Sequence, residues 1–140
     1  MLQAATVTSM EKFTRVSGQH LAEGLIGELN RPPNACWLFC APQKGIEELL
    51  AGIYDVLRMD TIIGCTTDGE ISNQGLTTET AVLGGIAADE LHFHVVVAEG
   101  LGSHGETAGR RLARALPPSI RYVQLFSDGL SGNGCALLRG

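Results

Sequence analysis

The sequence predicts an α/β domain with a mixed sheet, in which a parallel β-α-β-α-β segment is followed by an antiparallel hairpin and a further α-β unit. In the first 65 residues, apolar runs of strand length alternate with segments of helical period, as is typical of parallel strands covered by helices. The strand-like runs 80–87 and 91–98 are then separated only by Ala88-Asp89-Glu90. So short a connection favours a hairpin.

The first strand and helix are indicated by local signals. Residues 6–8 (Thr-Val-Thr) are typical of a strand. Apolar side chains then recur at helical spacing, at Leu21, Ala22, Leu25, Ile26 and Leu29. This period predicts a helix, capped by Ser17 or Ser9 and ended by Pro32 and Pro33.

Two further strands and one helix complete the parallel segment. Residues 35–41 (ACWLFCA) form a continuous apolar run, as expected of a strand covered on both faces. The helical period of residues 46–57 begins with two glutamates, where the helix dipole favours acidic side chains. Residues 61–65 are the next strand, and right-handed crossovers are expected between the parallel strands.

The last third of the chain predicts a helix from about residue 106 to 116, ended by Pro117-Pro118, and a strand at residues 122–127. Residues 135–140 resemble a helix that has only begun. We therefore expect residues 1–140 to be a single, incomplete domain, truncated at its C-terminus. Exposed apolar surface should then favour self-association of the fragment.

Composition excludes several classes of function. Of the 140 residues, 44 % are hydrophobic and 18 % are charged, and the net charge is -5 with no basic run. A nucleic-acid partner is therefore not expected, because phosphate binding needs clustered Lys and Arg. No apolar run is long enough to span a membrane, and the N-terminus does not resemble a signal peptide. A cytoplasmic protein with four reduced, buried cysteines is expected.

The candidate site is the run Ile62 to Ile71, in which a thiol, two hydroxyls and two carboxylates follow an apolar strand. A turn that only reverses the chain needs fewer such residues. Open α/β sheets bind ligands at the carboxyl ends of their strands. Asp68 and Glu70 alternate and could share one face to grip an amine or a cation, or they could form a plain turn with Glu70 in solvent.

Other patterns suggest alternative chemistry. Cys65 could act as a nucleophile, but it has no base nearby in sequence. Ser131 lies in a near match to the G-x-S-x-G elbow of hydrolases and acyltransferases. His92 and His94 share one face of a strand-like run and could chelate zinc if further ligands converged. We expect no catalytic residue, no metal and no cofactor.

Residues 100–105 (GLGSHG) match the dinucleotide fingerprint G-x-G-x-x-G, and Asp128 lies near the distance expected of a ribose-binding acid. This pattern makes a nucleotide-cofactor-binding enzyme the first alternative. However, the preceding strand belongs to a predicted hairpin, and too little chain follows to build a nucleotide-binding half-domain.

The runs TIIGCTTDGEI, TAVLGGIAADELHFHVVVAEG, AGRRLARAL and LFSDGLSGN together resemble the N-terminal part of the FIST domain, the F-box and intracellular signal transduction domain. The resemblance implies a small-ligand-binding sensory module of signal transduction rather than an enzyme. Amino acids or similar metabolites are the implied ligands, and a signalling output domain or partner protein the implied target. On this basis the ligand-binding candidates are Gly64, Cys65, Thr66, Thr67, Asp68, Gly69, Glu70, Asp128 and Gly129.

Overall fold

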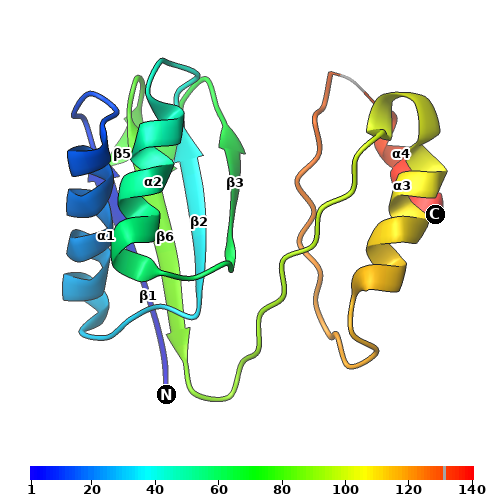
Figure 1. Cartoon of the computed structure of the whole chain (residues 1–140), viewed down its shortest axis with the longest axis horizontal. Helices are drawn as coiled ribbons and strands as arrows, with labels where there is room; N and C mark the ends of the chain where they lie inside the picture. Colours follow the sequence, from blue (N-terminus) through cyan, green and yellow to red (C-terminus); the bar gives the residue numbers. More distant parts are fainter. Residues whose placement is uncertain (131) are drawn as a thin grey trace. The chain divides into compact units, whose positions relative to one another are not determined.

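Four strands form one mixed sheet in the computed structural model, which describes residues 1–130 and 132–140. They are β1 (Leu2–Ser9), β2 (Ala35–Cys40), β3 (Ile62–Thr66) and β6 (Ala81–Ala88). Their order across the sheet is β1-β6-β2-β3. β2 and β3 pair in parallel, whereas β6 is antiparallel to both β1 and β2 (Figure 1). The predicted α/β class with a mixed sheet is confirmed.

β6 occupies a place that the sequence did not predict. β1, β2 and β3 run in the same direction, as expected. However, β6 lies between β1 and β2, and every residue of β1 and of β2 has a partner on it. The strand AVLGGIAA is made largely of small residues. A Cβ at Gly85 would lie 2.7 Å from Leu25 Cδ2, so this glycine admits the Leu25 side chain above the centre of the sheet.

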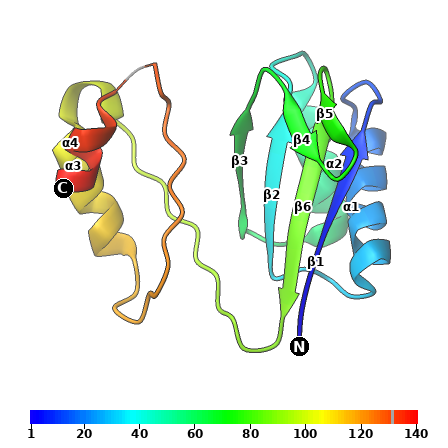
Figure 2. The same ribbon diagram turned by 180° about the vertical axis from the view of Figure 1, so that it is seen from behind.

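The structure contains a hairpin, but not at the predicted place. β4 (Glu70–Ser72) and β5 (Gly75–Thr77) form a two-stranded antiparallel sheet on the face of the main sheet away from the helices (Figure 2). The Thr8 hydroxyl of β1 donates to Ser72 Oγ at 3.2 Å. Residues 91–98, all of which are described, form no strand. The expected hairpin was wrong because β1 and β2 already occupy both edges of β6.

Helices α1 (Arg15–Leu29) and α2 (Ile46–Leu57) lie side by side on one face of the sheet (Figure 1). Their backbones approach closely at two glycines. A Cβ at Gly18 would lie 2.1 Å from the carbonyl oxygen of Leu49, and one at Gly52 would lie 1.9 Å from that of Arg15. The core between helices and sheet includes Leu21, Leu25, Leu29, Leu38, Leu49, Ile53 and Leu83.

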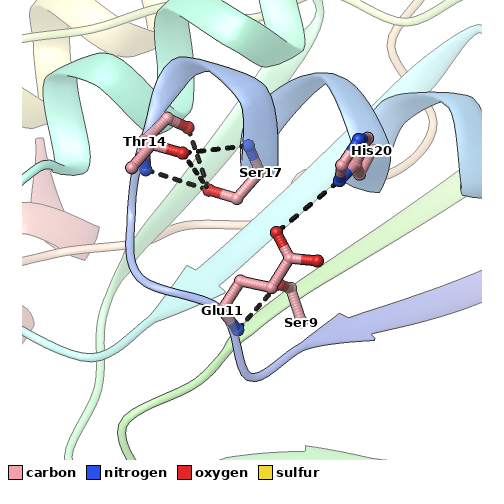
Figure 3. A network of polar contacts seen from close by, with 5 residues as sticks. All are labelled: Ser9, Glu11, Thr14, Ser17 and His20. Atoms are coloured by element: carbon pink, nitrogen blue, oxygen red, sulfur yellow. Dashed lines mark hydrogen bonds and ion pairs between the residues drawn. The ribbon is translucent and has the colours of Figure 1, made fainter.

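The N-terminus of α1 is capped by Thr14, not by Ser17 or Ser9 as predicted. The Ser17 amide donates to Thr14 Oγ1 at 3.1 Å, and the Thr14 amide donates to Ser17 Oγ at 2.9 Å (Figure 3). The two residues form a capping box with serine in the third helical position. Ser17 therefore contributes to the cap from within the helix and is not itself the N-cap residue.

The chain divides into two compact units, and ion pairs connect exposed parts of the first unit, Met1–Phe93. Two of the three guanidinium nitrogens of Arg15, Nε and Nη2, donate to the Asp55 carboxylate, at 2.6 and 2.7 Å, and so link α1 to α2. Arg31 contacts Asp89 at 2.6 Å. The α-amino group of Met1 and the Arg31 guanidinium lower the pKa of Asp89 from 3.8 to about 2. The Arg15 hydrogen bond likewise lowers the pKa of Asp55.

These lowered pKa values predict acid sensitivity. A carboxylate whose pKa is lower in the folded chain stabilises the fold fully above its unfolded pKa, and this contribution is lost as pH falls through the folded value. For Asp89 the window runs from about pH 4 to about pH 2. Urea unfolding across this window should show a smaller loss of stability for Asp89→Asn than for the unsubstituted chain. Equal losses would show that Asp89 makes no such contribution.

The second unit, His94–Gly140, contains α3 (Leu101–Ala115) and α4 (Gly134–Arg139). α3 begins at Leu101 rather than near residue 106, with a break in helical geometry at His104. The backbones of the two helices meet at glycines, since a Cβ at Gly109 would lie 2.0 Å from the carbonyl oxygen of Leu137. Residues 122–127, all described, form no strand, so that prediction was wrong. The short helix expected near residue 135 is confirmed.

Candidate functional site

The polar turn of residues 64–70 lies where β3 ends, beside the carboxyl end of its parallel neighbour β2. The pairing continues one residue past β3, because the Thr67 amide donates to the carbonyl oxygen of Cys40 at 2.9 Å. The chain then enters β4 at Glu70. This is the strand edge at which the sequence predicted a site.

Gly64 has a structural role in this motif. A Cβ at this position would lie 1.8 Å from the carbonyl oxygen of Leu38 on β2. Only glycine therefore permits the observed approach of β3 to β2. Gly69 is less crowded, because its Cβ would lie 3.1 Å from Leu76 Cδ1 on the flexible end of a side chain.

Glu70 is a buried carboxylate that connects three segments. Glu70 is only 1 % exposed to solvent. One carboxylate oxygen accepts a hydrogen bond from Thr67 Oγ1 at 2.8 Å. The other accepts from Thr80 Oγ1 at 2.6 Å and from the Thr80 amide at 3.3 Å. Glu70 thus ties the turn after β3 to the residue that precedes β6.

Thr77 completes this network from β5. Its hydroxyl lies 2.9 Å from Thr80 Oγ1 and donates toward the carbonyl oxygen of Glu70 at 3.3 Å. Thr77 and Thr80 were not among the predicted site residues. The run Thr77-Thr78-Glu79-Thr80 carries three hydroxyls directly before a strand. That cluster is the signal that sequence reasoning could have used.

Asp68 and Glu70 do not share one environment. Asp68 is exposed, as are Cys65 and Thr66, whereas Glu70 is buried. Both sequence readings of Glu70 were therefore wrong, since its side chain neither faces solvent nor lies on one face with Asp68. Two surface depressions in the described chain are lined by other residues: Gln43, Gly45, Ile46, Glu47 and Glu48, and Ala4, Ala5, Thr6, Glu28 and Asn73. Ligand binding by the turn stays a prediction.

The four cysteines are free thiols in two environments. Cys36 and Cys40 are buried, as predicted, whereas Cys65 and Cys135 are exposed. Burial raises the pKa of Cys36 to about 12. Burial, followed by the charge of Glu70, also raises the pKa of Cys40. The two buried thiols are therefore protonated and unreactive at neutral pH.

The candidate residues of the second unit occupy a loop. Asp128 and Gly129 are exposed, and Asp128 Oδ1 accepts a hydrogen bond from the Leu130 amide at 2.9 Å. This contact is typical of an Asx turn. Ser131, the alternative nucleophile, lies outside the described residues.

The dinucleotide fingerprint lacks the setting that it requires. The residues before Gly100 form no strand, and α3 starts directly after it, so that residues 101–105 are helical apart from the break at His104. Gly105 instead packs against α4, since its Cβ would lie 3.0 Å from the Ala136 side chain. A strand-loop-helix cradle for a pyrophosphate is not formed by these described residues.

Neither a metal site nor a membrane-spanning helix is found in the described part of the chain. No group of three or more His, Cys, Asp or Glu side chains in residues 1–130 and 132–140 is placed to hold a metal ion, and His92 and His94 are exposed. Among the same residues, no helix has both the length and the apolar character needed to cross a bilayer.

Together, the mixed sheet, the helix pair on one face and the hydrogen-bonded polar turn define an α/β domain with a candidate site at a strand edge. The family model of the FIST N domain matches residues 34–140. The chain therefore belongs to the FIST N domain family, a family of sensory domains in signalling proteins. No curated protein and no solved structure shows a significant match.

Proposed function

We propose that this domain senses a small polar metabolite, with amino acids as the first class to test, through the turn of residues 64–70. Family membership supports a sensory role. The observation that carries the choice of site is the exposed group of Cys65, Thr66 and Asp68, which a buried hydrogen-bond network holds at the end of two parallel strands. The domain acts as a sensor and not as an enzyme.

Roles within the turn follow from exposure. The Asp68 carboxylate pairs with the ammonium group of the ligand, since charge-assisted hydrogen bonds are the strongest available to an exposed site. The hydroxyl of Thr66 and the thiol of Cys65 provide further contacts. The shape of the turn is maintained by its other residues, Gly64, Thr67, Gly69 and Glu70.

The roles proposed for the second unit and for a signalling output domain rest on family membership alone. Asp128 and Gly129 belong to the run LFSDGLSGN that resembles FIST domains, and both are exposed. Binding is passed on to a signalling output domain or a partner protein.

The proposal predicts a ligand-dependent rise in stability that needs Asp68. A ligand at a hundredfold excess over its Kd adds about 2.7 kcal/mol to the free energy of unfolding. Thermal melts with single amino acids should show such a rise for at least one of them. Asp68→Asn should abolish the shift and leave the ligand-free melting temperature unchanged, because this side chain is exposed.

Asp60→Asn is the matched control, since Asp60 is equally an exposed aspartate but lies before β3 instead of after it. Its ligand shift should equal that of the unsubstituted chain. If no amino acid raises the melting temperature, or if the shift survives Asp68→Asn, the assignment fails. A shift with nucleotides alone would favour the alternative based on residues 100–105.

A further inference from the structure

We propose that Glu70 is a positioning residue of the sensing turn, acting through Thr67, and not a ligand contact. This inference rests on the proposed function, because the position of the turn matters for sensing only if the turn binds a ligand. It assigns different tasks to the two carboxylates of the motif, Asp68 and Glu70.

The first argument is the occupancy of the carboxylate. Both oxygens of Glu70 accept hydrogen bonds from within the chain, and the residue is 1 % exposed. All of these donors are neutral, namely two hydroxyls and one amide. A ligand could reach this carboxylate only by displacing Thr67 or opening the network around Thr80, which is itself 3 % exposed.

The second argument is the direction of the connection. Thr80 directly precedes β6, and its carbonyl oxygen accepts a hydrogen bond from the Ala41 amide at 3.0 Å. Thr80 is therefore fixed to the chain that follows β2. The Glu70 side chain accepts hydrogen bonds from both Thr80 and Thr67, and so it connects the fixed Thr80 to the turn that contains Thr67.

The third argument is that Thr67 is held from two sides. Its amide is bonded to Cys40 of β2, and its hydroxyl is bonded to Glu70. Thr67 lies between the exposed residues Thr66 and Asp68, so restraining it restrains the backbone from which both side chains project. Loss of the hydrogen bond between Thr67 and Glu70 should free this backbone, whereas the hydrogen bond between Thr80 and Ala41 should remain.

Amide hydrogen exchange without any ligand tests this directly. Thr67→Val preserves the shape of the side chain and removes only the hydroxyl that donates to Glu70. Loss of a hydrogen bond to a charged group should raise the exchange rate of the amide at position 67 about tenfold. The amides of β6 should exchange at the rate of the unsubstituted chain. Thr78→Val makes the same chemical change at an exposed site and should alter neither rate.

Two results would overturn the inference. An unchanged rate at position 67 would show that the Glu70 contact does not restrain the turn. A parallel rise at position 67 and throughout β6 would show that Glu70 supports only global stability.

A second measurement separates this inference from the proposed function. Thr67→Val should also weaken the thermal shift given by an amino acid that stabilises the unsubstituted chain. If no amino acid gives a shift but the exchange pattern is as expected, positioning stands and the ligand assignment fails. If an amino acid gives equal shifts in both proteins, the positioning role is wrong and the sensing role stands.

Discussion

Replacing Gly18 with alanine is expected to lower the free energy of unfolding by about 3 kcal/mol, at the upper end of the cost of overpacking. The new Cβ would lie 2.1 Å from the carbonyl oxygen of Leu49 and 3.0 Å from the amide nitrogen of Ile53. Both are backbone atoms of α2, so neither can rotate away as a side-chain end could. Relief requires α1 and α2 to separate, which opens the core between them.

Gly27→Ala is the matched control, because Gly27 lies in the same helix and a Cβ there would meet nothing within 4 Å. This substitution should stabilise the chain by about 0.5 kcal/mol, since alanine is the better helix former. Urea unfolding followed by fluorescence of Trp37, the single tryptophan, measures both. Similar effects of the two substitutions would mean that the helices do not meet as closely as the structure shows.

Glu70→Ala is expected to destabilise the chain by about 3 kcal/mol or more, because it leaves the buried Thr80 amide and hydroxyl without their acceptor. Asp68→Ala, two residues earlier in the same motif, should change stability by no more than about 0.5 kcal/mol, because the side chain is exposed. The comparison is made in the same urea titrations.

Glu70→Gln separates the shape of the network from its charge. Its amide oxygen can accept from Thr80 while its NH₂ group donates to the hydroxyl of Thr67, so most contacts survive. The expected loss is about 1 kcal/mol. A loss as large as that of Glu70→Ala would show that the negative charge itself holds the network. Negligible losses for both would contradict the hydrogen-bonded geometry.

Local sequence signals located most elements of the first unit. The apolar run 35–41, the helical period of residues 46–57 and the strand before the turn all appear close to their predicted bounds. The pairing of the strands was not predicted correctly. Residues 91–98 alternate in a strand-like way, but alternation does not reveal that β6 has no free edge. Strand order depends on contacts between residues far apart in sequence, and a window of neighbouring residues does not contain that information.

The site shows the same division. Its place at the end of β3 could be predicted from an apolar strand followed by thiol, hydroxyl and carboxylate groups. The burial of Glu70 could not, because its donors at Thr80 come from beyond a hairpin that the sequence pattern did not indicate. The spacing of Asp68 and Glu70 suggested one shared face, and the bend between them separates one exposed and one buried carboxylate.

The central place of β6 also determines the order in which the domain can be built. β1 lies at an edge of the sheet, and its pairing joins Leu2 to Ala88. During synthesis β1 leaves the ribosome well before β6, so its hydrogen bonds to Ala81–Ala88 can form only as that later strand emerges. The parallel β2–β3 pair needs far less chain. Because such distant contacts slow folding, we expect β1 to stay unpaired until β6 has been synthesised, with its backbone open to other chains and to chaperones.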